Sequence, residues 1–119
     1  MTDSELEARQ RAYETGIRYG RVDARAGLTE PSSDPEHIVG EAHADIWRRG
    51  WDEGHKVTMA PLRTPGTRVS VPSLVPGMRV AATVTGQVKI VEGILRVECY
   101  TMGGTAPLWV PVPRVQTKS

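Results

Sequence analysis

The sequence is poor in the features that mark secreted, disulfide-bonded and membrane proteins. Its 119 residues include a single cysteine, Cys99, which excludes an internal disulfide framework and a cysteine-cluster zinc site. No apolar run approaches the roughly 20 residues that a membrane-spanning helix needs. The opening residues, MTDSELEARQ, are polar and acidic, unlike a secretory signal. We therefore expect a cytoplasmic protein in a reducing compartment, without membrane association.

The sequence also lacks the motifs of common enzymes and cofactor-binding proteins. It contains no GxxxxGK[ST] phosphate loop and no GxGxxG motif after a predicted strand. His37, Glu41 and His43 are close in sequence, but their spacing is not that of a zinc site. No histidine is placed in sequence to activate Cys99 as a nucleophile. We expect a protein that is not an enzyme and that binds no cofactor and no metal.

Charge is divided unevenly between the two halves of the sequence. Residues 1–60 contain eight Lys and Arg against twelve Asp and Glu, a net charge of −4. Residues 61–119 contain seven against two, a net charge of +5. This asymmetry indicates two units with different partners. A basic half suits nucleic acid or an acidic protein, and it is also typical of an ordinary solvated surface.

Residues 1–59 have the pattern of two helices. Ser4 and Glu7 form a capping box at the start of an apolar stripe with helical spacing, and the polar stretch TEPSSDP ends that helix. Asp34 then caps a second helix, which begins with proline and runs to about Lys56. The sequence therefore predicts a two-helix hairpin.

Small residues recur every four positions in these predicted helices. A glycine within a helix costs about 0.5–1 kcal/mol relative to alanine, so their ordered placement favours a close contact between the helices. Trp47 and Trp51 lie beside the glycines of the second helix and would cover this contact. Exposure of both tryptophans to a partner is the competing interpretation. The predicted packing residues are Ala12, Gly16, Gly20, Ala24, Trp47, Gly50, Trp51 and Gly54.

The pattern RAYETGIRYGRVDARAG, a polar turn and then IWRRGWDEG resembles ribosome modulation factor over about residues 9–56. The resemblance implies a helical hairpin that binds the bacterial ribosome near the messenger exit region and promotes inactive ribosome dimers. That family is strongly basic, whereas this half is acidic, and residues 60–119 have no counterpart in it. The matching residues are Ala12, Tyr13, Gly16 and Gly20 in the first helix and Trp47, Gly50 and Trp51 in the second.

The second half has the pattern of short strands. Residues 60–77 contain four prolines and two glycines, which predicts a linker that leads into a first strand. Residues 78–119 then alternate with a period of two, with a tight turn at Glu92-Gly93. We expect an α+β protein in which the hairpin precedes a small antiparallel β-barrel of about five strands, SH3-like or Tudor-type.

Arginines on the first helix are candidates for contacts with nucleic acid. Arg11, Arg18 and Arg25 are seven residues apart and share one side of the helix, with Arg21 adjacent, so each could meet a phosphate. Glutamates lie four residues before Arg11 and before Arg18, so a salt-bridged, solvated face is the competing interpretation.

The barrel half adds basic and aromatic candidates. Tyr100 and Trp109 could stack on bases beside basic side chains, although Trp109 is also a candidate core residue. The leading expectation is association with the ribosome or RNA that modulates translation. The alternative is an adaptor, monomeric or homo-oligomeric, that binds a protein partner without RNA. The predicted nucleic-acid contacts are Arg11, Arg18, Arg21, Arg25, Arg79, Lys89 and Arg96, with Arg68 and Arg114 as further basic candidates.

Overall fold

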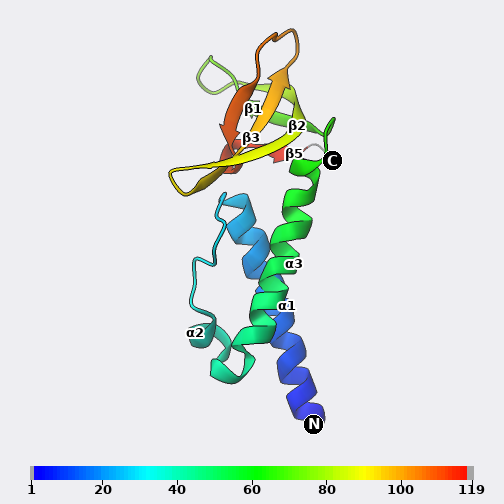
Figure 1. Ribbon diagram of the computed structural model, residues 1–119, viewed down its shortest axis with the longest axis vertical. Coiled ribbons are helices and arrows are strands. Elements are labelled where there is room, and N and C mark those ends of the chain that lie inside the picture. Colours follow the sequence, from blue (N-terminus) through cyan, green and yellow to red (C-terminus); the bar gives the residue numbers. More distant parts are fainter. Residues whose placement is uncertain (1, 118–119) are drawn as a thin grey trace. The chain divides into compact units, whose positions relative to one another are not determined.

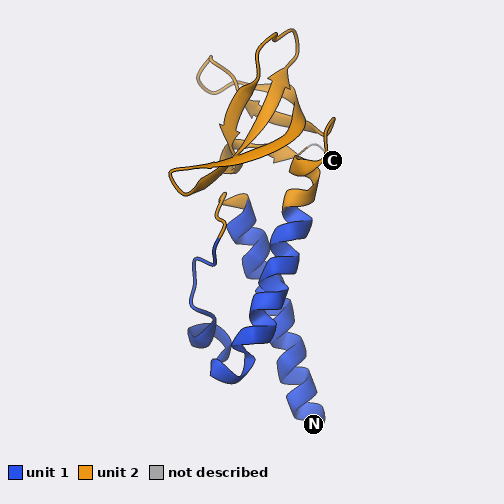
Figure 2. Cartoon of the chain, in the orientation of Figure 1, with its two compact units in different colours: residues 1–24, 30–58 blue, residues 25–29, 59–119 orange. Residues whose placement is uncertain are grey.

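The computed structural model describes residues 2–117, which form helices followed by a five-stranded antiparallel sheet (Figure 1). The α+β class predicted from the sequence is confirmed. The chain divides into two compact units (Figure 2). Unit 1 comprises residues 1–24 and 30–58, and unit 2 comprises residues 25–29 and 59–119.

Unit 1 is built from two long helices and a short helical segment. Thr2, whose hydroxyl accepts the Glu5 N–H at 3.2 Å, takes the capping place predicted for Ser4. Asp34 caps the short helix as predicted, accepting the Glu36 N–H at 3.0 Å. Gly40, with a φ of 82°, separates this short helix from the next, so the predicted second helix is divided. The elements are α1 (Asp3–Arg25), α2 (Pro35–Val39), a 3-10 turn η1 (Glu41–His43) and α3 (Ala44–Arg63).

The two long helices run parallel, so they do not form the predicted two-helix hairpin. Contacts between them advance together along both chains: Gly16 lies against Trp47, and Gly20 against Trp51. Figure 1 shows the chain passing back along the helix pair between α1 and α2 before α3 begins. The nine residues 26–34 contain no helix or strand, and a segment of that length spans up to about 30 Å when extended. This return segment makes the parallel arrangement possible.

Helix α3 continues beyond the predicted end near Lys56 and includes Pro61. A proline inside a helix removes one backbone hydrogen bond, and the proline-rich composition therefore predicted a linker here. The last turn of α3 instead belongs to unit 2, where Met59 and Leu62 are buried. Burial of these two side chains offsets the loss of one hydrogen bond near the helix end.

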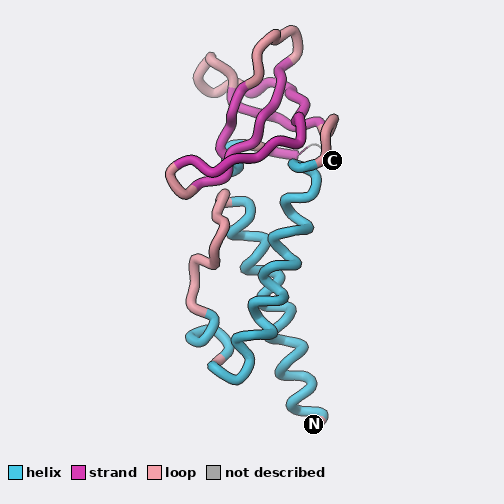
Figure 3. Tube along the Cα trace, in the orientation of Figure 1, coloured by secondary structure: helices cyan, strands magenta, loops and turns pink. Residues whose placement is uncertain are grey.

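The sheet of unit 2 is open, so the predicted closed barrel is wrong. Its strand order is β4-β3-β2-β1-β5, so β4 and β5 are its edges. Figure 3 shows the strands of the sheet in magenta. These edge strands have only four and two residues, and β4 ends at Pro111. Short strands and proline at an edge limit further pairing. The strands are β1 (Arg68–Pro72), β2 (Arg79–Val91), β3 (Ile94–Thr101), β4 (Leu108–Pro111) and β5 (Gln116–Thr117), with a 3-10 turn η2 (Val112–Arg114) before β5.

One face of the sheet carries the core of unit 2. The register of β2 against β3 shifts between Val84 and Val88, where Gly86 adopts a φ of 94°. A turn at Glu92-Gly93 joins these strands, as the sequence predicts. The alternation along β3 places Leu95, Val97 and Cys99 on this buried face. The buried strand residues are Val69, Val71, Ala82, Val84, Leu95, Val97, Cys99 and Val110.

A short segment from the N-terminal half of the sequence contributes to unit 2. The Gly27 carbonyl accepts the Leu95 N–H at 2.7 Å, although 68 positions separate the two residues in sequence. Gly27 has a φ of 78°, and a Cβ there would lie 2.9 Å from Ile94 Cγ2. Glycine at this position therefore permits both the turn after α1 and the approach to β3.

Candidate functional site

The glycines of α1 and α3 lie where the two helix backbones touch. A Cβ on Gly16 would overlap the Trp47 carbonyl oxygen, and one on Gly20 would overlap the Trp51 carbonyl oxygen. The relation is reciprocal, because a Cβ on Gly50 would overlap a carbonyl of α1. Such proximity lets the Cα–H groups of each helix face carbonyl oxygens of the other. The remaining contact pairs Gly54 with Ile17, while Ala12 and Ala24 are buried.

Both tryptophans of α3 are core residues. Trp47 is 0% exposed and Trp51 is 5% exposed, which agrees with the packing interpretation and leaves neither ring available to a partner. Trp47 lies against Tyr19, with ring centroids 5.7 Å apart, and Trp51 stacks on His55 at 4.8 Å. These rings cover the seam that the glycines form.

Asp23 joins both long helices to the return segment. Its Oδ2 accepts the Trp51 Nε1–H at 2.8 Å and the Ser32 N–H at 3.1 Å, and its Oδ1 accepts the Ser32 hydroxyl at 2.7 Å. Burial acts to raise the pKa of Asp23, but these hydrogen bonds and the nearby His55 hold it below its ordinary value. The sequence analysis missed Asp23, because an acidic residue on an amphipathic helix usually faces solvent.

The predicted arginines of α1 are exposed to solvent. Within residues 2–117, neither the Glu7–Arg11 nor the Glu14–Arg18 ion pair forms, and Glu14 accepts a hydrogen bond from Gln10 at 3.2 Å. The salt-bridged interpretation of this face is therefore not supported. The exposed arginines of the row are Arg11, Arg18, Arg21 and Arg25.

The predicted basic residues of the sheet differ in what they contact. Arg79 donates to the Ser70 hydroxyl at 2.9 Å and to the carbonyls of Ser70 and Arg114, both at 2.7 Å. It therefore joins β1, β2 and the turn before β5, and these structural contacts occupy its guanidinium. Arg68 is exposed on β1.

Lys89 and Arg96 lie on the sheet face opposite the buried valines. The two residues pair directly across β2 and β3, and the Lys89 ammonium lies 4.2 Å from the Trp109 ring centroid. The Arg96 side chain makes no hydrogen bond or ion pair among residues 2–117, and its Nε is buried without a partner. Glu98, opposite Trp109 on β4, accepts the Thr85 hydroxyl at 2.9 Å. This face thus combines two cations with an aromatic ring.

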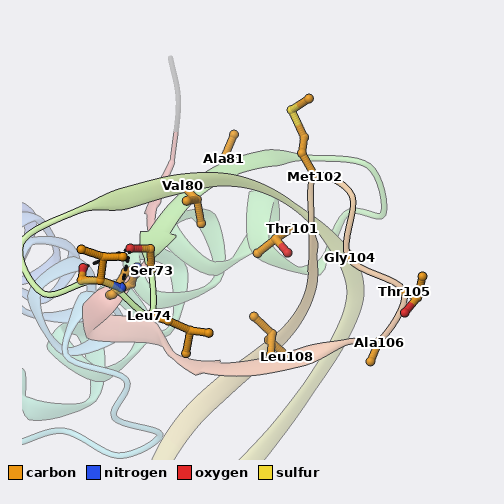
Figure 4. Close-up of a pocket in the computed structure, with 12 residues that line it drawn as sticks. Ser73, Leu74, Val80, Ala81, Thr101, Met102, Gly104, Thr105, Ala106 and Leu108 are labelled. Carbon is orange, nitrogen blue, oxygen red and sulfur yellow. Dashed lines mark hydrogen bonds between the residues drawn. The ribbon is translucent and has the colours of Figure 1, made fainter.

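A separate apolar groove lies between the β1–β2 and β3–β4 loops of unit 2, with a volume of about 800 Å³. Figure 4 shows Leu74, Val80, Thr101 and Leu108 pointing toward one another across it. The side chain of Met102 extends away from the groove and is 89% exposed. No charged side chain lines this groove. The sequence analysis missed it, because its lining comes from two loops far apart in sequence and from the strand ends beside them, which no local pattern brings together.

Cys99 shows no sign of nucleophilic chemistry. It is fully buried on β3, and burial together with Glu98 raises the pKa of its thiol. Among residues 2–117, no three His, Cys, Asp or Glu side chains gather in a way that would hold a metal ion. The helices of this part of the chain are all too short or too polar to cross a membrane.

The comparisons with known proteins add no assignment. No protein family, no curated protein and no solved structure matches the chain.

Proposed function

We propose that this protein associates with the ribosome or with RNA and thereby modulates translation. The observation that carries the proposal is the row of exposed arginines on α1, which have no ion-pair partner among the described residues. Exposed guanidinium groups without a carboxylate partner are available to phosphates. The resemblance to ribosome modulation factor supports the same partner. It rests on the glycines of α1 and on the tryptophans and Gly50 of α3.

The sheet supports the proposal in a second way. The open five-stranded antiparallel sheet carries Lys89, Arg96 and Trp109 on the face opposite its buried valines. Small folds of this kind serve many functions, so the fold does not choose a ligand. The cations and aromatic ring on its outer face, rather than the fold, are the features compatible with RNA.

The test is co-sedimentation of the purified protein with bacterial ribosomes on a sucrose gradient, at low and then moderate salt. We expect Arg11→Glu combined with Arg18→Glu to weaken association by about 3 kcal/mol, since each charge-assisted contact contributes about 1.5 kcal/mol or more. Arg48→Glu combined with Arg49→Glu is the matched control, because both residues are exposed on α3 and the charge change is equal. Equal losses in both double variants would show that only net charge matters, and no loss in the first would refute the assignment to α1.

The apolar groove favours a second candidate, an adaptor that binds a protein partner. Leu74 is fully exposed at the groove and Met102 is 89% exposed, and large exposed apolar side chains commonly mark protein interfaces. The same gradient separates the two functions. Leu74→Ser combined with Met102→Ser should leave ribosome association unchanged if RNA is the partner. Loss of association in this variant, together with weak salt dependence, would favour a protein surface as the partner.

A further inference from the structure

Three side chains on the outer face of the sheet form a compact group. Lys89, Arg96 and Trp109 come from β2, β3 and β4. Lys89 is directly opposite Arg96, and its ammonium lies 4.2 Å from the Trp109 ring centroid. We call these residues, with Tyr100, the sheet platform.

Arg96 is the member whose environment most needs explanation. A guanidinium carries five N–H donors, and the described part of the chain offers Arg96 no acceptor for any of them. A half-buried cation with a fully buried Nε is costly to leave without an acceptor. A phosphate bound from outside would meet the exposed part of this half-buried side chain rather than its buried Nε.

The aromatic members give the platform its second property. Tyr100 lies on β3 and is 41% exposed, and Trp109 is half-buried on β4. Because Glu98 pairs with Trp109, Tyr100 is a diagonal neighbour of Trp109 on the same face, and diagonal neighbours are about 7–8 Å apart, within reach of aromatic side chains. Two rings at this spacing, beside two cations, suit unstacked bases and the phosphates that link them.

We propose that the sheet platform binds single-stranded RNA, with bases stacked on Trp109 and Tyr100 and phosphates held by Lys89 and Arg96. This inference rests on the proposed association with RNA and names the form of RNA recognised. Single strands fit because their bases are free to stack on side chains, whereas the bases of a duplex are covered by their neighbours. Glu98 lies on the same face opposite Trp109, and the hydrogen bond that it accepts from Thr85 does not remove the charge of a carboxylate. The phosphates are therefore placed at Lys89 and Arg96 rather than beside Glu98.

The test uses the full-length protein and a fluorescein-labelled ten-nucleotide oligouridylate, alone and annealed to oligoadenylate. We expect Tyr100→Ala and Trp109→Ala each to weaken binding of the single strand about tenfold, while Tyr100→Phe and Trp109→Phe retain most of it. Lys89→Ala should reduce the slope of log affinity against log salt by about 0.7, the value for one lost phosphate on a single strand. If Trp109→Ala disturbs folding, the comparison of Tyr100→Ala with Tyr100→Phe still tests the platform, because Tyr100 is exposed.

The outcomes separate this inference from the proposed function. Equal affinity for the single strand and the duplex, or unchanged binding by Tyr100→Ala and Trp109→Ala, would overturn the platform. Ribosome co-sedimentation without oligouridylate binding would overturn the platform and leave the proposed function standing. Binding of polyglutamate in place of oligouridylate would identify an acidic protein as the partner and would also overturn it. Tenfold losses in both alanine variants, with unchanged binding by Arg11→Glu combined with Arg18→Glu, would support the platform as a site of its own.

Discussion

At the scale of single residues, Asp23 holds Ser32 of the return segment against the two long helices of unit 1. Its carboxylate is 3% exposed and accepts hydrogen bonds from Trp51 on α3 and from Ser32. The folded state lowers the pKa of Asp23, so its ionised form stabilises the fold above the ordinary aspartate value of about 4. This stabilisation is lost as the pH falls through the lowered pKa of the folded state.

We expect Asp23→Ala to lower the free energy of unfolding by about 3 kcal/mol at pH 7, because it leaves the buried Trp51 N–H without an acceptor. Asp23→Asn keeps an acceptor oxygen but loses the charge, so its cost should be about 1 kcal/mol. Urea denaturation at pH 7 measures both values.

The dependence of the free energy of unfolding on pH tests whether the charge of Asp23 causes this stabilisation. The difference between the wild type and Asp23→Asn should be largest near neutral pH and should shrink below about pH 4, where the Asp23 carboxylate protonates in the unfolded chain before it does in the folded one. Asp34→Asn is the matched control, because Asp34 is exposed and asparagine caps helices about as well as aspartate. A difference that stays constant from pH 7 to pH 3 would show that the charge of Asp23 does not stabilise the fold.

Residues that belong to a repeating pattern were within reach of sequence analysis, and residues that act alone were not. Trp47, Trp51 and Cys99 lie on periodic apolar faces, and all three are buried. Asp23 is buried with hydrogen-bond partners on other parts of the chain, whereas the buried Nε of Arg96 has no partner among the described residues. Their positions depend on strand pairing and on the return segment, which no local pattern specifies.

At the scale of secondary structure elements, the close contact between α1 and α3 predicts that a glycine-to-alanine change within it lowers the free energy of unfolding. Glycine to alanine normally stabilises a helix by up to about 1 kcal/mol. Gly20→Ala should instead lower the free energy of unfolding by about 2 kcal/mol or more, because its Cβ would overlap the Trp51 carbonyl. Val22→Ala, at a position that is 62% exposed on the same helix, should change it by less than about 0.5 kcal/mol. Urea denaturation compares the two, and a stabilised Gly20→Ala variant would contradict the close contact.

The same elements show why the direction of the helices could not be predicted. The spacing of small residues identifies which face of each helix is in contact, and Gly16, Gly20, Gly50 and Gly54 do lie there. A periodic face is the same for a parallel and an antiparallel partner. The choice depends on whether the connecting residues turn at once or run back along the pair. Composition indicates that these residues are not helical, but not which path they take.

At the scale of the whole molecule, the two units do not correspond to two continuous stretches of sequence. The change in composition near residue 60 lies close to Met59, where unit 2 resumes after unit 1. Residues 25–29 also belong to unit 2, and nothing in their composition distinguishes them from the rest of the first half. The hydrogen bond from Leu95 to Gly27 is a contact between distant parts of the chain, and local patterns do not record such contacts.

This contact predicts that a change in the first quarter of the sequence destabilises the sheet. Gly27→Ala places a side chain at a positive φ, which costs about 1–2 kcal/mol, and brings a Cβ against Ile94. Gly66→Ala is the matched control, because Gly66 also has a positive φ but no atom within 4 Å of its Cβ position. We expect Gly27→Ala to cost about 1 kcal/mol more in urea denaturation and to accelerate hydrogen exchange at the Leu95 amide, which Gly66→Ala should not do. Equal exchange at Leu95 in both variants would mean that residues 25–29 do not support the sheet, and that unit 2 depends on residues 59–119 alone.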